Sequence, residues 1–402
     1  MEKFRPRDHS GHAEGEGVTG SLETWQWVYA AVVRYRTEVS KASSALELMG
    51  APDNGRATMS ETYPAPDQYN LLGRPESGFT MKVLSALRYK QVPYQWLDRF
   101  THNKLFKQHA KVQLIPLLFL PDGTAMQDST PILELLEERH PEPGIHPTDP
   151  ALHFLSDLLE EYGDEWGNKL MFHYRWSYPE DQKRRSRTLA EGSLGGLTVP
   201  WFGKLMKPLV APLLVRRMVP RMAFAGSTDN NRPILVSSFD RLVELLERHL
   251  QGRSYVFGER PALADFGLWG QLHQAYTDPS CHKILEDKGP SIVAWIKRME
   301  SPELLGDFEA LENLTLTLRP IFSEEVGPRF LAWAAANARA WEKGEKQTGL
   351  TMAGQRYYQK TFKYPAQGFT RLRSQFASVS EHPALTEFLH DTGCLKFLEP
   401  SP

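Results

Sequence analysis

The sequence has little cysteine, no long apolar run and almost no net charge. Its 402 residues include two cysteines, Cys281 and Cys394, which excludes a disulfide framework and an all-cysteine zinc site. The 47 Lys+Arg and 49 Asp+Glu leave a net charge of −2, so no overall charge favours nucleic acid or an anionic membrane. The apolar stretch over 209–215 falls well short of the roughly 18–20 residues of a membrane span. We therefore expect a cytoplasmic protein that has no nucleic-acid partner and makes no membrane contact.

The first part of the chain differs in composition from the rest. Residues 1–20 are rich in Gly, His and Glu and lack the apolar region of a secretory signal, which predicts a disordered tail. Apolar residues at helical spacing predict an amphipathic helix over 21–49, and three prolines over 50–66 predict a linker. Residues 1–65 are thus predicted to be a tail, a helix and a linker.

The next segment, 66–146, alternates strand and helix signals. Within 68–140 the order is β-α-β-α-β-β-α, and a Pro-Asp-Gly-Thr turn over 121–124 joins the last two strands as a hairpin. A β-α-β unit followed by a hairpin and a final helix predicts a small mixed sheet covered by helices.

After the Pro-rich hinge over 141–150, strand signals disappear. Helical periodicity predicts an all-α domain over 151–310 and an additional helical extension over 311–402. The predicted helices of both parts cover residues 151–177, 232–250, 264–277, 290–300, most of 327–343, 352–376 and 383–392.

Two motifs carry a resemblance to a known family. Residues 112–141 hold Ile-Pro, then Asp-Gly, then Asp-Ser, and end in Leu-Glu-x-x-His-Pro; residues 257–266 hold a Gly, a Pro and then Ala-Asp before a buried helix. In this order they resemble the glutathione transferase superfamily, over roughly 66–310. The resemblance implies a thioredoxin-like α/β N-terminal domain followed by an all-α C-terminal helical domain, with glutathione as co-substrate.

The Asp128–Ser129 pair begins a predicted helix that has Pro131 in its first turn. Free backbone N–H groups and the Ser129 hydroxyl suit a small carboxylate, and the Asp128 carboxylate can accept hydrogen bonds from an α-ammonium. The alternative is that Ser129 only caps its helix. The resemblance implies that the pair binds the γ-glutamyl end of glutathione. It also implies a cis bond between Ile115 and Pro116, with the Ile115 backbone facing the cysteinyl part.

The resemblance places the catalytic position at Ser77, just before a helix that begins Gly78-Phe79-Thr80. A hydroxyl there would donate a hydrogen bond to the glutathione thiolate and lower the pKa of the thiol. Thr80 is the rival donor, and the alternative for both residues is simple capping. Because 68–140 contains no cysteine, a thiol–disulfide enzyme is excluded, which leaves a serine-type transferase or a non-catalytic relative.

Other residues have weaker signals. His173, Tyr174 and Arg175 lie in an aromatic-rich helix and are candidates for a second-substrate pocket, although a histidine among aromatics is more often packed core. Asp265 follows Ala262 at a helix start and is predicted to be structural. Pro208, Pro212 and Pro220 argue against one long amphipathic helix in the basic stretches over 183–187 and 204–221. No metal motif is present, so we expect no metal.

The resulting prediction is a serine-type glutathione transferase that attacks a small hydrophobic electrophile by conjugation, dehalogenation or ether cleavage, with a role in detoxification. The resemblance implies a homodimer. The alternative is a non-catalytic scaffold of the same fold for protein or membrane association.

Overall fold

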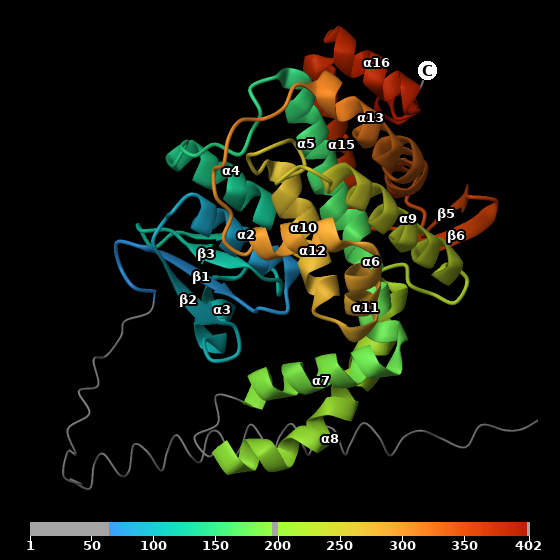
Figure 1. The fold of residues 1–402 in the computed structure, drawn as a ribbon. Helices are drawn as coiled ribbons and strands as arrows, with labels where there is room; N and C mark the ends of the chain where they lie inside the picture. The colour runs from blue at the N-terminus through green and yellow to red at the C-terminus, as the bar shows by residue number, and fades with distance from the viewer. Residues whose placement is uncertain (1–63, 195–199, 400–402) are drawn as a thin grey trace, which may run out of the picture. The chain divides into compact units, whose positions relative to one another are not determined.

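The computed structural model describes residues 64–194 and 200–399 (Figure 1). The predicted tail, the predicted helix and most of the predicted linker fall on residues 1–63 and lie outside the described residues. Among the described residues, no helix is long and apolar enough to cross a membrane.

The α/β part has the predicted order of elements. They are β1 (Tyr69–Gly73), α2 (Gly78–Tyr89), β2 (Tyr94–Asp98), α3 (Asn103–His109), β3 (Leu117–Phe119), β4 (Ala125–Gln127) and α4 (Ser129–Arg139). The sheet order is β2-β1-β3-β4; β1 and β2 are parallel, and the other pairs are antiparallel. The mixed sheet predicted from the sequence is confirmed.

Alternation along β1 divides the core of this part between the two faces of the sheet. Leu71 packs with residues of α2 and α4, whereas Leu72 joins a separate cluster with Phe106 of α3. Successive strand residues point to opposite faces, so neighbouring leucines serve different layers. The sheet is therefore covered by α2 and α4 on one face and by α3 on the other (Figure 1).

A helical part follows. Its elements are α5 (Pro150–Tyr162), the π-helical η1 (Gly163–Gly167), α6 (Asn168–Ser177), α7 (Pro179–Leu194), α8 (Pro200–Met218), the 3-10 helix η2 (Val219–Ala223), α9 (Arg232–Leu250), α10 (Leu263–Tyr276), α11 (Pro279–Lys288) and α12 (Pro290–Arg298). Helix α8 continues through Pro208 and Pro212, but it ends at Met218, before Pro220, and is a separate helix from α7. Each proline removes one backbone donor, but the contacts between α7 and α8 hold the helix together.

Helix α10 is central to the helical part, and all of its residues except His273 and Tyr276 are buried. It contacts α2 so closely that a Cβ on Gly78 would lie 2.6 Å from the Gly270 carbonyl oxygen. The residue after Ser77 is therefore glycine for a structural reason: the first turn of α2 lies against the backbone of α10.

Asp265 organises the start of α10, as predicted. Its carboxylate accepts hydrogen bonds from the backbone N–H groups of Val256 and Ala262, and from Trp295 Nε1, each at 2.9 Å. Burial raises the pKa of Asp265 to about 6, although these donors act in the opposite direction. The carboxylate thus supplies one half of a capping box, the bond to the N-cap N–H, although Ala262 has no hydroxyl for the other half.

The C-terminal extension contains α13 (Leu311–Ile321), the π-helical η3 (Phe322–Leu331), α14 (Ala332–Glu342), β5 (Gln347–Met352), β6 (Gln355–Lys360), α15 (Lys363–Val379), α16 (Pro383–Asp391) and α17 (Leu395–Leu398). The predicted helix over 352–376 is correct only from residue 363, because β5 and β6 form an antiparallel hairpin. Ala353 and Gly354 have φ of 46° and 76°, which form its tight turn. The extension is therefore not purely helical.

Helix α15 of the extension packs on α5. Arg371 pairs with Glu161 at 2.7 Å, and the Phe376 ring lies 5.6 Å from the Phe154 ring. Buried residues of the extension belong to the same hydrophobic core as α5 and α10. The extension is thus an integral part of this body.

Candidate active site

Three chain segments that carry predicted site residues meet at one edge of the sheet. In the ladder, Leu72 of β1 pairs with Leu117 of β3, and Leu117 pairs with Gln127 of β4. One step further along each strand lie Gly73, Pro116 and Asp128. The register therefore brings the loop that leads to Ser77, the Ile115–Pro116 bond and the start of α4 to the same edge.

Ser77 is half-buried and is the N-cap of α2. Its Oγ accepts a hydrogen bond from the Thr80 backbone N–H at 3.2 Å. Ser77 therefore does cap the helix, as the alternative proposed. A hydroxyl that accepts one bond keeps its own proton, so Ser77 Oγ can still donate to a ligand.

Thr80 lies beneath this loop and is fully buried. A Cβ on Gly73 would lie 2.1 Å from Thr80 Cγ2, so the Thr80 side chain packs directly under the Gly73 backbone. Its hydroxyl is enclosed by protein, whereas that of Ser77 is at the edge. The geometry favours Ser77 over Thr80 as the donor to a bound thiolate.

The Ile115–Pro116 peptide bond is cis, as expected from the resemblance. The bond comes directly before β3, where the Pro116 nitrogen takes no part in the described ladder with β1. The Ile115 backbone is thereby at the sheet edge beside the start of α4.

Asp128 and Ser129 form the first turn of α4. Asp128 has φ of 82° and is the N-cap residue, and Ser129 is the first, buried residue of the helix. Whether Ser129 binds a ligand or only supports the helix start stays a prediction. Burial raises the pKa of Asp128, while Lys82 and Arg371 act to lower it.

A buried cluster of charges lies directly under this turn. Lys82 Nζ of α2 is fully buried; it donates to Thr130 Oγ1 at 3.2 Å and to Asp164 Oδ2 at 2.7 Å, and it contacts the Glu160 carboxylate. Burial is the largest influence and lowers the pKa of Lys82, but Asp164 and Glu160 together outweigh it and the pKa is raised. Lys82 thus stays charged and joins the α/β part to α5 and η1.

Further acidic groups surround this cluster. Burial raises the pKa of Glu161 and Asp164, whose carboxylates also repel the nearby Glu160. Arg371 of the extension pairs with Glu161, and its charge also acts on Asp128. The extension therefore brings a positive charge into the electrostatic surroundings of the α4 N-terminus.

Arg74, in the loop before Ser77, is neutralised by carboxylates. It pairs with Glu76 at 2.8 Å and with Asp98 at 2.5 Å. A Cβ on Gly192 of α7 would lie 2.2 Å from Arg74 Nη2, so α7 lies against this guanidinium. The arginine fixes the loop between β2 and α7.

The predicted second-substrate residues are all buried in the helical part. His173 contacts Ser227 Oγ at 2.6 Å, and burial lowers its pKa to about 4; Tyr174 packs on the Phe239 ring. Arg175 pairs with Asp278 at 2.7 Å and donates to the Glu76 carbonyl at 3.1 Å. Arg175 therefore supports the loop that carries Ser77, while a substrate pocket at these residues stays a prediction.

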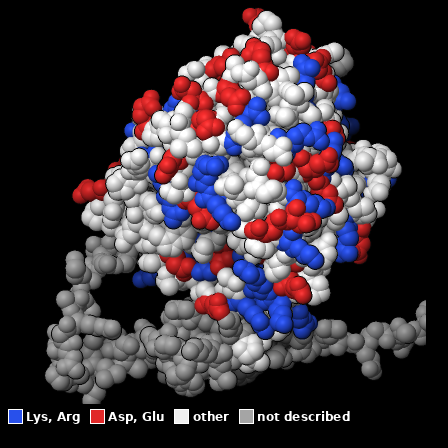
Figure 2. All heavy atoms as spheres, viewed as in Figure 1, with Lys and Arg blue, Asp and Glu red and all other residues white. Residues whose placement is uncertain are grey.

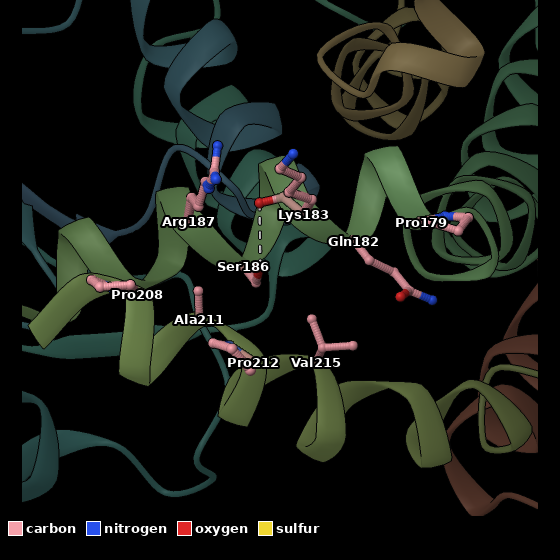
Figure 3. Close-up of a pocket in the computed structure, with 9 residues that line it drawn as sticks. All are labelled: Pro179, Gln182, Lys183, Ser186, Arg187, Pro208, Ala211, Pro212 and Val215. Carbon is pink, nitrogen blue, oxygen red and sulfur yellow. Dashed lines mark hydrogen bonds between the residues drawn. The ribbon is translucent and has the colours of Figure 1, made fainter.

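A cavity of about 540 Å³ lies between α7 and α8 (Figure 3). Ser186, Ala211, Pro212 and Val215 face one another across it, whereas Arg187 points away from α8 (Figure 3). Lys and Arg side chains gather over α7 on the surface (Figure 2). The basic residues of this region are evident from the sequence, whereas the cavity depends on how α7 and α8 pack.

Comparison with known proteins gives matches to both parts of the chain. Residues 71–144 match the family described as glutathione S-transferase, N-terminal domain, and residues 221–298 match glutathione S-transferase, C-terminal domain. Glutathione S-transferase U6 of Arabidopsis thaliana is 24% identical over 253 residues, which are 60% of this chain and 88% of that protein.

Solved structures are similar over a comparable share of the chain. The β-etherase LigF from Sphingobium sp. strain SYK-6 is 20% identical with a TM-score of 0.38, over 58% of this chain and 95% of that one. A glutathione S-transferase of Methylobacterium radiotolerans, in complex with glutathione sulfonate, is 20% identical with a TM-score of 0.36, over 58% and 91%.

Proposed function

Because this chain belongs to the glutathione S-transferase superfamily, we propose that it binds glutathione at the sheet edge and directs the thiolate at a small hydrophobic electrophile. The reaction would be conjugation, dehalogenation or ether cleavage, because each begins with attack by the same thiolate. The observation that carries the proposal is the convergence of Ser77, the Ile115–Pro116 bond and Asp128–Ser129 at one edge.

The head group of glutathione would lie at the first turn of α4. Its carboxylate would accept hydrogen bonds from the free backbone N–H groups and from the Ser129 hydroxyl, at the positive end of the helix dipole. Asp128 would accept from the α-ammonium. This arrangement is supported by the position of Ser129 as the first residue of α4, directly after the Asp128 N-cap.

The thiolate would lie beside Ser77. The Thr80 N–H holds Ser77 Oγ in place, so its proton is available for the sulfur. A hydrogen bond to the charged form, together with the N-terminus of α2, favours the thiolate and lowers the pKa of the thiol. Ser77 would stabilise charge and would not itself attack, which makes this a serine-type enzyme.

The protein's own thiols do not compete for this role. Cys281 and Cys394 are both buried, and burial raises the pKa of Cys394 to about 12. A thiol with a raised pKa is a poor nucleophile at neutral pH. The attacking sulfur would therefore come from the bound peptide. The homodimer and the cytoplasmic location stay predictions.

A second candidate function is a non-catalytic scaffold. The exposed Lys183, Arg184 and Arg187 on α7 form a basic surface that favours an acidic protein or membrane partner. Such a scaffold would not need an ionised thiol at Ser77. Measurements on bound glutathione therefore separate the two functions.

The test is calorimetric binding of glutathione together with titration of the ultraviolet absorbance of the bound thiolate. We compare wild type, Ser77→Ala and Ser77→Asp, because Asp keeps the capping acceptor but has no proton to donate at neutral pH. Loss of a hydrogen bond to a charged group is worth about 1.5–3 kcal/mol, so the bound thiol pKa should rise by about 1–2 units in both variants.

Ser323→Ala is the matched control, because Ser323 is exposed and its hydroxyl donates only to the Pro320 carbonyl. It should leave the thiol pKa unchanged. If wild type does not bind millimolar glutathione, the proposed function fails and the scaffold is favoured. If glutathione binds but neither Ser77 variant changes the thiol pKa, only the role of Ser77 is wrong.

A further inference from the structure

A group of metal-ligand residues lies away from the sheet edge, where α4 leads into α5. His153 and Asp157 are one turn apart on α5, so they share a face of that helix. His146, in the segment before α5, stacks its ring on His153 with centroids 4.4 Å apart and planes inclined by 15°. One ligand atom from each of the three residues lies within 4.8 Å of the others. We propose that His146, His153 and Asp157 bind a divalent transition-metal ion, for which Zn²⁺ is the best fit.

Two of the donor atoms are buried and unused. His146 Nδ1 and Asp157 Oδ1 are both inaccessible to solvent, and neither has a hydrogen-bond partner. His153 Nε2 lies 3.9 Å from Asp157 Oδ1, which is too far for a hydrogen bond. Buried polar atoms are nearly always paired in folded proteins, because each unpaired one costs free energy. Two such atoms on residues whose ligand atoms lie within 4.8 Å of one another indicate a bound ligand.

The other polar atom of each buried donor is held by a partner from elsewhere in the chain. His146 Nε2 lies 3.2 Å from Glu134 Oε2 of α4, and Asp157 Oδ2 accepts from Gln375 Nε2 of α15 at 3.0 Å. A carboxylate on the far nitrogen of a metal-bound histidine fixes its tautomer and orientation. Here it would leave His146 Nδ1 free to coordinate, and Gln375 would direct Asp157 Oδ1 inward.

The donor set selects the metal. Two imidazoles and one carboxylate suit Zn²⁺ and its neighbours better than Ca²⁺ or Mg²⁺, which prefer oxygen ligands. Tetrahedral Zn²⁺ with bonds of about 2.0–2.1 Å needs ligand atoms about 3.3 Å apart. The His153 side chain is 45% exposed and is thus free to move the remaining distance. Three protein ligands leave the fourth position for water.

A metal at this position would join three parts of the chain. His146 follows the α/β part, His153 and Asp157 belong to the helical part, and Gln375 belongs to the extension. Bound metal should therefore stabilise the fold, by an amount that grows with the logarithm of the free metal concentration above the Kd. This role is independent of the proposed reaction at the sheet edge.

The test uses the full chain, treated with a chelator, dialysed and titrated with Zn²⁺ in competition with a chromophoric chelator. We expect about one Zn²⁺ per chain in this site. His153→Gln should weaken binding at least tenfold, and Glu134→Gln should weaken it by roughly 10–100-fold, as changes behind a ligand do. Because the His153 side chain is half exposed, the His153→Gln variant should fold. A glutathione affinity or a circular dichroism spectrum equal to that of wild type would confirm this.

Two controls account for other histidines. His390→Gln removes an exposed histidine that also lies beside an aspartate, Asp391, and should leave the affinity unchanged. A His9→Gln/His12→Gln variant removes the two histidines of the N-terminal segment and should also retain the site. The proposal is overturned if His153→Gln binds Zn²⁺ as tightly as wild type, or if the high-affinity site is lost with His9 and His12.

Thermal unfolding gives an independent readout. Zn²⁺ should raise the melting temperature of wild type and of His390→Gln, but not that of Asp157→Asn. Co²⁺ titration should give a visible absorption band from a low-coordinate site with histidine ligands, and Asp157→Asn should weaken it. An equal Zn²⁺-dependent shift in wild type and Asp157→Asn would contradict the assignment.

Discussion

Two polar regions meet at the first turn of α4, and they differ in how their groups are paired. At the sheet edge, Ser77 Oγ accepts one hydrogen bond and keeps a proton to donate, and Ser129 is the first residue of α4. Directly beneath, Lys82 is bonded to Thr130, Glu160 and Asp164 at once. Ser129 and Thr130 are neighbours in sequence, yet the first is proposed to bind the ligand, whereas the second belongs to the buried network.

The difference shows which polar groups serve binding and which serve the fold. A group that binds a ligand must keep donors or acceptors unused until the ligand arrives, so it lies at an edge. A buried charge must be compensated within the protein, because desolvation without partners costs several kcal/mol. Substitutions at the sheet edge should therefore change the binding and the thiol pKa of glutathione. Substitutions in the buried charge network should change the free energy of unfolding.

The largest expected effect is that of Lys82→Met. Removing this cation leaves the buried Glu160 and Asp164 carboxylates uncompensated, and breaking a buried pair in this way costs about 3–5 kcal/mol. Urea unfolding at neutral pH measures the loss. Lys288→Met, at an exposed lysine, is the control and should change stability by less than about 0.5 kcal/mol. An equally small effect in Lys82→Met would show that the buried network does not hold the two parts together.

A smaller effect is expected for Gly78→Ala, at the contact between α2 and α10. The new Cβ would lie 2.6 Å from the Gly270 carbonyl oxygen, and such overpacking costs about 1–3 kcal/mol. Gly167→Ala is the matched control, because its Cβ would first meet Gln271 at 3.6 Å, an ordinary contact. Denaturant unfolding of both variants tests this. If Gly78→Ala were as stable as Gly167→Ala, the close approach of the two helices would be wrong.

The most gradual effect is spread over several pH units and concerns Glu325, a buried carboxylate that has no lysine partner among the described residues. It accepts hydrogen bonds from Ser238 and Tyr162, and Arg329 lies 3.7 Å away. Burial raises the pKa of Glu325 from 4.5 to about 8. Between these values the folded state binds a proton that the unfolded state does not, so the free energy of unfolding falls as pH rises, by at most about 1.4 kcal/mol per unit.

Glu325→Gln removes this titration. Its unfolding free energy, measured across pH 5–8, should fall less steeply than that of wild type, so the two curves diverge toward pH 8. Glu312→Gln, at an exposed glutamate, should follow wild type. Parallel curves for Glu325→Gln and wild type would mean that Glu325 is ionised in the fold.

Much of the α/β part could be predicted because its signals are local. The strand and helix order follows from periodicity and from the Asp122-Gly123 turn, and Gly123 has the positive φ of 80° that such a turn needs. The β5–β6 hairpin was missed although it has a signal: Thr348, Met352 and Tyr357 alternate with exposed residues around Ala353-Gly354. The helical periodicity belongs to α15, which begins at Lys363, and does not reach back to residue 352.

The site was predictable in part for the same reason. Ser77, the Ile115–Pro116 bond and Asp128–Ser129 each stand in a short motif, and the sheet register then brings them together. His173 and Arg175 were less predictable. Their roles depend on Ser227 and Asp278, far away in sequence, which turn both side chains to structural contacts.

The sequence by itself determined the family, the order of the α/β elements and the residues at the sheet edge, because these depend on neighbours along the chain. Only the tertiary structure decided which polar and charged groups have partners within the protein and which do not. Lys82 finds its carboxylates on α5 and η1, and His146 meets Asp157 only after α4, α5 and α15 have packed. The reason is physical: burial and pairing are set by distances in space, and no local pattern of residues encodes these distances.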